Sequence, residues 1–301
     1  MLQNWQPSQT LAARITKAAS QQSYYTIRFL ADRERVPDAF RAYAYFRWLD
    51  DRLDQGALTR YERMAFVNRQ QTLVDRCYQG ERPRDLTIEE TMLVDLIGSD
   101  QGKNSGLQAY IRNMMAVMAF DAGRRGRLIS QQELDNYSRW LAVAVTEALH
   151  YFIGHGRYSP HSEARYHAVM GAHIAHILRD TLEDADAGYF NVPREFFHQH
   201  GITPRDVQSE PYRAWVQSRV QLARRHFRSG KDYLTQVESP RCRLAGYAYI
   251  ARFEWVLDAI EREGYRLRLA YDDRKNLWTG LKMSGSALAL TLNPRHQEQP
   301  A

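Results

Sequence analysis

The hydrophobic pattern along the chain is that of one helix after another. Apolar residues recur at spacings of three and four, and the alternation typical of strands is scarce. We expect one all-α domain over residues 1–301, because no linker is long or polar enough to separate a second domain. The predicted helices cover residues 10–30, 34–54, 59–78, 87–98, 106–121, 131–155, 161–184, 210–228 and 242–263.

Several of these helices carry clear start signals. Thr59, Thr87 and Ser130 each precede a glutamate by three residues, which predicts a capping box at each position. Ser159-Pro160 places a proline just inside the start of another helix. A break is expected at Ser229–Gly230. The resulting fold is an all-α bundle with a central apolar cavity.

Two predicted helices begin with apolar residues and end with carboxylates on the same face. Asp51 lies beside the first stripe, and like charges four residues apart repel. The alternative is a solvated helix end, with Arg47–Asp51 and Arg179–Glu183 as surface ion pairs. The first stripe consists of Val36, Phe40, Tyr43, Arg47, Asp50 and Asp54, and the second of His173, His176, Asp180 and Asp184.

Paired carboxylates of this kind suit Mg²⁺. This ion prefers oxygen ligands and usually takes one or two carboxylates together with substrate phosphate oxygens. Several such ions between two acidic faces would bind a diphosphate and neutralise it as a leaving group. An apolar, aromatic cavity would then hold a hydrocarbon tail and stabilise a carbocation.

Charge and composition narrow the class of protein. The net charge is +6, but the arginines are dispersed among acids and no nucleic-acid motif is present, so we expect no nucleic-acid partner. Cys77 and Cys242 give no disulfide framework, which favours a cytoplasmic location. The N-terminus lacks a secretory pattern and no apolar run could span a bilayer. Any membrane contact would be peripheral, and the basic surface could help to make it.

Five stretches together resemble the squalene and phytoene synthase family, the head-to-head prenyl synthases of the isoprenoid-synthase fold. The resemblance covers about residues 20–265, in the family's order and spacing. The two aspartate-rich motifs carry most of it. The stretches are SYYTIRFL (Ser23–Leu30), YAYFRWLDDRLD (Tyr43–Asp54), FDAGRRGRLISQQELDNYSRWLAVAV (Phe120–Val145), HILRDTLEDADAGYFNVP (His176–Pro193) and FEWVLDAIEREGY (Phe253–Tyr265).

The resemblance implies a reaction and a set of site residues. Two allylic diphosphates, of the farnesyl or geranylgeranyl kind, would be joined through a cyclopropylcarbinyl diphosphate. Mg²⁺, or Mn²⁺ in its place, would assist, and the need for NADPH stays open. The implied metal ligands are Asp50, Asp54, Asp180 and Asp184. The implied diphosphate contacts are Ser23 and Arg47, Asp51 and Arg179 are assigned to the substrate site, and Tyr43 joins the catalytic set.

Six positions depart from the family pattern. The family usually has asparagine at His176 and glutamine at His173, small glycines at Val143 and Thr146, and arginine and tyrosine at Tyr189 and Asn191. His176 could ligate a metal, although imidazole favours softer ions than Mg²⁺, or it could be hydrogen-bonded in the cavity wall. We therefore expect a divergent member with an altered cavity.

Three hypotheses about function follow. The first is a prenyl synthase making a C30 or C40 hydrocarbon. The second is a catalytically silent relative that binds lipid or assists assembly. The third is different chemistry on the same scaffold, either hydroxysqualene formation or cyclisation of one diphosphate. The segment Gly123–Arg127 is interpreted as a basic loop, and the oligomeric state is not readable from the sequence.

Overall fold

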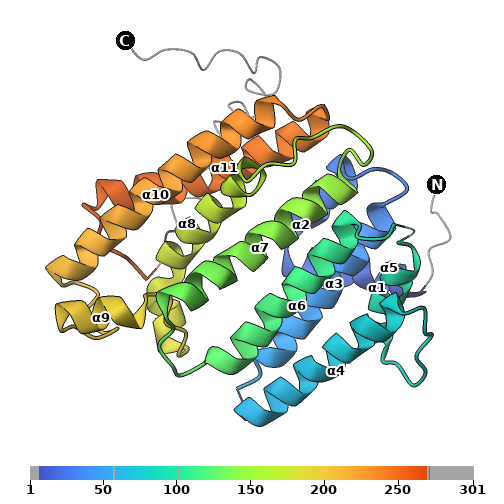
Figure 1. Cartoon of the computed structure of the whole chain (residues 1–301), viewed down its shortest axis with the longest axis horizontal. Helices are drawn as coiled ribbons and strands as arrows, with labels where there is room; N and C mark the ends of the chain where they lie inside the picture. Colours follow the sequence, from blue (N-terminus) through green and yellow to red (C-terminus); the bar gives the residue numbers. More distant parts are fainter. Residues whose placement is uncertain (1–6, 57, 101, 270, 272–301) are drawn as a thin grey trace. The chain divides into compact units, whose positions relative to one another are not determined.

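The chain is all-helical wherever the structure describes it. The computed structural model describes residues 7–56, 58–100, 102–269 and 271, and these contain no strand, which confirms the predicted fold class (Figure 1). Residues 272–301, which the single-domain prediction included, lie outside the described residues. The helices are α1 (Pro7–Ala19), α2 (Gln21–Leu30), α3 (Val36–Leu53), α4 (Arg60–Tyr78), α5 (Ile88–Gly98), α6 (Gly106–Arg124), α7 (Gln131–Phe152), α8 (Ala164–Asp186), α9 (Arg194–His200), α10 (Glu210–Thr235) and α11 (Pro240–Arg262).

The chain divides into two compact units. The first consists of Met1–Gly123 and Glu147–His155, and the second of Arg124–Thr146 and Gly156–Ala301. Helix α7 belongs to both, because its first part lies in the second unit and its last part in the first. The interpretation of the whole chain as one domain stays a prediction.

In the first unit, α3 is packed against α1, α2 and α5. A buried polar chain connects three of the helices: the hydroxyl of Tyr45 on α3 donates to Gln70 Oε1 on α4 (2.9 Å), and Gln70 Nε2 donates to Glu90 on α5 (2.9 Å). Arg69 also donates two hydrogen bonds to Glu90. Each of these side chains has a hydrogen-bond partner, so the network fixes how these helices meet. It therefore holds the helix that carries the first acidic motif.

The helix starts in the first unit follow the capping signals, with one correction. Both predicted capping boxes, at Thr59 and Thr87, are formed. The predicted helix over residues 10–30 is wrong, because the chain leaves the helical conformation at Ser20 (φ −155°) and begins again. The Ser20 hydroxyl accepts a hydrogen bond from the Ser23 N–H at 3.1 Å, so this serine caps the new helix α2.

In the second unit, α10 and α11 pack against α8. Gly171 on α8 and Gly230 on α10 lie at close approaches between helices: a Cβ on Gly171 would lie 2.8 Å from the Phe227 ring, and one on Gly230 would lie 2.9 Å from the Ala168 nitrogen. The predicted break at Ser229–Gly230 is therefore wrong. The glycine lies inside α10, where its missing side chain makes room for α8.

Among the other helix starts of the second unit, some agree with the prediction and others differ from it. The predicted box at Ser130 is formed, with its N–H donating to Glu133 at 2.7 Å and its hydroxyl accepting at 3.1 Å. Helix α8 begins at Ala164 rather than near residue 161, and the Ser159 hydroxyl accepts from Arg165 (2.7 Å) and does not cap the helix. Helix α9 was missed. This helix is only seven residues long, and Gly201 in the left-handed conformation (φ 62°) ends it.

Candidate active site

The first acidic motif lies at the C-terminal end of α3. Asp50 and Asp51 belong to its last turn, and Asp54 is its C-cap residue. Carboxylates at this end of a helix face the negative pole of the helix dipole, and Asp50 and Asp54 are also a repelling pair four residues apart. Helix stability alone disfavours this arrangement, so the motif is suited to holding a cation.

The surroundings of Asp50 strengthen that conclusion. The pKa of Asp50 is raised to about 6: burial contributes most, the neighbouring carboxylates of Asp54 and Asp121 add to it, and Arg47 lowers it. Asp121 lies on α6, and we did not single it out from the sequence, although it stands inside the stretch FDAGRRGR. Above pH 6 this part of the first unit therefore concentrates negative charge from two helices.

Arg47 lies on the same end of α3 and is exposed. Its guanidinium donates to Asp50 Oδ2 at 3.4 Å and also to Asp51, so the ion pair expected of a solvated helix end is present. Tyr43, one turn earlier, is half-buried and close enough to influence Arg47 electrostatically. Ser23 lies in the first turn of α2, half-buried. The predicted diphosphate contacts of Ser23 and Arg47 stay predictions.

The second acidic motif lies at the C-terminal end of α8, whose last turn has no basic residue. Arg179 donates two hydrogen bonds of 2.6 Å to Asp180, so it pairs there and not with Glu183 as the surface-pair alternative required. Burial alone would raise the pKa of Asp180, but hydrogen bonds from Arg179 and His176 outweigh it and hold that pKa well below its usual range. Asp180 is thus an ionised carboxylate.

The two histidines of α8 lie in different environments. His176 is exposed, and its Nε2 lies 2.9 Å from Asp180 Oδ2. His173 is 4% exposed and neither ring nitrogen has a hydrogen-bond partner among the described residues. Burial lowers the pKa of His173 to about 3, with contributions from His176 and two arginines, so its ring is neutral. The Tyr137 ring on α7, which sequence reasoning missed, packs edge-on against His173 at 5.1 Å.

Asp184 is held by Asn191, a residue of the segment after α8. The side-chain amide of Asn191 donates to Asp184 Oδ2 at 2.8 Å. Arg124, at the end of α6, donates to Asn191 Oδ1 at 2.7 Å, and its guanidinium lies 5.0 Å from the centre of the Tyr189 ring. The sequence did not reveal these contacts because residues 124 and 191 are far apart along the chain.

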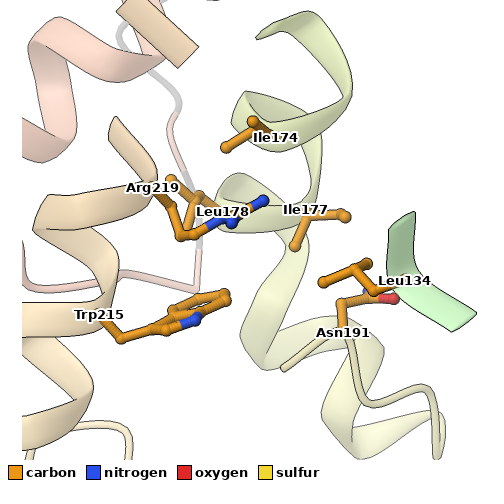
Figure 2. A pocket seen from close by; sticks show the side chains of 7 residues that line it. All are labelled: Leu134, Ile174, Ile177, Leu178, Asn191, Trp215 and Arg219. Carbon is orange, nitrogen blue, oxygen red and sulfur yellow. The ribbon is translucent and has the colours of Figure 1, made fainter. Parts of the chain in front are cut away.

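A small hollow in the second unit lies next to this motif (Figure 2). Its walls come from α7, α8, α10 and the segment after α8. Its cavity volume is about 10 Å³, far below the about 300–1,000 Å³ of common ligand sites, so the predicted cavity for a prenyl tail stays a prediction. The lining residues are Leu134, Ile174, Ile177, Leu178, Asn191, Trp215 and Arg219.

The carboxylates suit Mg²⁺ as part of a ligand set that water and phosphate oxygens complete. Within the residues that the structure describes, no group of three or more His, Cys, Asp or Glu side chains could hold a metal ion. Mg²⁺ commonly takes one or two carboxylates and completes its shell with water and phosphate oxygens, and Asp50 and Asp54 provide such a pair. Asp180 with the adjacent imidazole of His176 would also suit Mn²⁺.

Across residues 7–56, 58–100, 102–269 and 271, no helix is long and apolar enough to cross a membrane. The cytoplasmic location and the peripheral membrane contact that we expected stay predictions.

Comparison with known proteins identifies the class. The chain belongs to the squalene/phytoene synthase family, whose pattern matches residues 16–281. This is a family of prenyl transferases whose members bind prenyl diphosphates. The chain is 25% identical over 245 residues to "Phytoene synthase 1, chloroplastic" of Solanum lycopersicum, a match that covers 77% of this chain and 56% of that protein. The chain therefore spans little more than half the length of this curated relative.

Solved structures show the same fold. A dehydrosqualene synthase in complex with ligand matches with a TM-score of 0.72 at 15% identity, covering 94% of this chain and 95% of the other. Squalene synthase HpnC from Alicyclobacillus acidocaldarius matches with a TM-score of 0.68 at 19% identity, covering 87% and 95%. The described part of the chain, which is all-helical, thus has the isoprenoid-synthase fold, as expected.

Proposed function

We propose that this protein joins two allylic prenyl diphosphates, of the farnesyl or geranylgeranyl kind, head to head. One observation carries the proposal: within a chain of this family, two long helices each end in a pair of carboxylates one turn apart, at Asp50–Asp54 and Asp180–Asp184. The Asp50–Asp54 pair opposes the dipole of its own helix and burial raises the pKa of Asp50, which makes a purely structural role of this pair unfavourable.

The roles of the residues follow from their contacts. Asp50, Asp54, Asp180 and Asp184 would hold Mg²⁺, or Mn²⁺ in its place. When bound, this ion would neutralise the diphosphate leaving group. Arg47, anchored by Asp51, would contact diphosphate oxygens together with Ser23, and guanidinium suits them because it pairs through two N–H groups.

Two further side chains support this set. Arg179 keeps Asp180 ionised and oriented through its paired hydrogen bonds. Tyr43, half-buried on the same stripe of α3, would face the reacting carbons, where an aromatic ring stabilises positive charge.

The proposed reaction breaks one C–O bond in each of the two substrates. The C–O bond of the first substrate breaks and its electron pair leaves with diphosphate. The double bond of the second substrate attacks the allylic cation, and loss of a proton closes a cyclopropylcarbinyl diphosphate. Loss of the second diphosphate and rearrangement give the joined hydrocarbon. A hydride from NADPH would end the sequence in a reduced product, and loss of a proton would end it in an unreduced one.

A second candidate is an altered product on the same scaffold. Val143 and Thr146 stand on α7 where the family usually has glycines, and the buried Thr146 hydroxyl has no hydrogen-bond partner among the described residues. Extra side-chain volume and a polar group would favour a hydroxylated C30 alcohol or cyclisation of one diphosphate.

A product assay tests both candidates. Purified protein is incubated with farnesyl or geranylgeranyl diphosphate and Mg²⁺ or Mn²⁺, with and without NADPH. Diphosphate release is followed and the extracted products are identified by mass. A metal-dependent C30 or C40 hydrocarbon supports the first candidate, and a hydroxylated or single-prenyl product supports the second. No release by a folded protein, with the same result for Asp50→Asn and Asp180→Asn, would refute both and favour a silent relative.

A further inference from the structure

The segment after α6 is fastened along the chain that follows α8. The N–H of Gly126 donates to the carbonyl of Gly188 at 2.8 Å, and the N–H of Arg194 donates to the carbonyl of Ile129 at 2.8 Å. The Arg125 guanidinium also donates to the Ala187 carbonyl at 3.1 Å. The two segments are therefore held together within the second unit, next to the second acidic motif.

Within this structure, Arg124 is held in one place. It is 5% exposed, and its guanidinium contacts two aromatic rings, 4.9 Å from the centre of Tyr137 and 5.0 Å from that of Tyr189. A buried guanidinium stacked on rings has little freedom, because each ring face attracts the cation and neighbouring atoms exclude other rotamers. The direction of its hydrogen bond to Asn191 is therefore fixed.

The chemistry of the three groups allows only one arrangement of Asn191. Arginine only donates hydrogen bonds and an ionised carboxylate only accepts them, whereas an asparagine amide does both through different atoms. With Arg124 donating to Oδ1 at 2.7 Å, the amide must turn Nδ2 toward Asp184, where it donates at 2.8 Å. Asn191 is itself 6% exposed, so it is not free to turn away.

We propose that Arg124, acting through Asn191, is a positioning residue that fixes the Asp184 carboxylate for divalent-cation binding. This inference rests on the proposed function, because it takes Asp184 to be a ligand. It also gives a reason for two of the departures noted in the sequence, Tyr189 and Asn191, which stand where the family usually has arginine and tyrosine. Here Tyr189 stacks on Arg124, at the end of α6, and Asn191 accepts a hydrogen bond from it. Groups behind a metal ligand typically change metal affinity about 10–100-fold.

The first test measures Mn²⁺ binding to the substrate-free protein by the electron paramagnetic resonance signal of free Mn²⁺. We expect Arg124→Met and Asn191→Leu each to weaken binding about ten-fold. The double variant should be no weaker than either single variant, because both remove the same relay. Arg124→Lys, which keeps a donor, should recover most of the affinity. Arg139→Met is the matched control, because Arg139 lies in the same unit and stacks on a ring, that of Tyr166, but pairs with Glu163; it should change binding less than two-fold.

A second readout is the Mg²⁺ concentration that gives half-maximal diphosphate release, which should rise in the same variants while circular dichroism reports that they are folded. Parent-like binding in Arg124→Met and Asn191→Leu, alongside weakened binding in Asp184→Asn, would overturn the relay and leave the proposed function standing. Parent-like binding in Asp184→Asn would overturn the ligand role of Asp184, and with it this inference. Additive losses in the double variant would also contradict a single relay.

Discussion

The buried imidazole of His173 should make the protein sensitive to acid in a way that one substitution removes. The ring is neutral in the folded chain, because burial lowers its pKa from 6.5 to about 3. In the unfolded chain the ring takes up a proton near its ordinary pKa. As the pH falls below 6.5, the unfolded state therefore binds a proton that the folded state does not bind. The free energy of unfolding consequently declines until about pH 3.

The magnitude follows from the difference in pKa. Each unit corresponds to about 1.36 kcal/mol, so acidification from about pH 7.5 to 4.5 should remove roughly 2–3 kcal/mol through this one group. The full effect is retained because His173 is 4% exposed and solvent does not screen it. His173→Gln, which introduces the residue that the family usually has there, keeps a polar side chain and removes the titration.

Urea unfolding followed by circular dichroism measures this effect at pH 7.5, 6 and 4.5. We expect the parent to lose roughly 2–3 kcal/mol more than His173→Gln over this range, with an unchanged dependence on urea concentration. His161→Gln is the matched control, because His161 is exposed in the same unit and should leave the difference unchanged. Equal losses in the parent and His173→Gln would refute the reasoning and mean that the ring is solvated or protonated in the fold.

Three further substitutions test other features by urea unfolding. Gly230→Ala should lower the free energy of unfolding by about 1–3 kcal/mol, because its Cβ would meet the Ala168 backbone nitrogen at 2.9 Å. Ser20→Ala should lower it by about 1 kcal/mol through the lost cap of α2, without changing Mn²⁺ binding. Asp50→Asn should raise it at pH 8, where the raised pKa of about 6 leaves a destabilising charge. The gain should be only about 1 kcal/mol, because the side chain is 43% exposed, and it should vanish at pH 4. In the same variant, Mg²⁺ should raise the free energy of unfolding less than it does in the parent.

Local signals in the sequence were enough for most of the fold. Thr59 and Thr87 start helices where their capping boxes predict, because a cap depends on residues three apart. The errors arose where tertiary contacts decide. Gly230 reads as a break but is needed for the approach of α8, and Ser159 reads as a cap but binds Arg165.

The candidate site shows the same division. The spacing of Asp50 and Asp54, or of Asp180 and Asp184, places each pair on one helix face without any knowledge of the fold. Asp121 and Arg124 could not be assigned in that way, because their relation to the acidic motifs depends on distant segments. The contact of Arg124 with Asn191 spans 67 positions along the chain, beyond any periodicity.

The placement of acidic residues at the end of α3 has a consequence for the life of the protein in a cell. A fold that carries repelling carboxylates is less stable empty than filled, and a ligand that binds only the folded state stabilises it in proportion to the logarithm of its concentration. A small gain in stability reduces the unfolded fraction that proteases can reach. Under the proposed function, the abundance of this protein should therefore follow the supply of divalent cation and diphosphate.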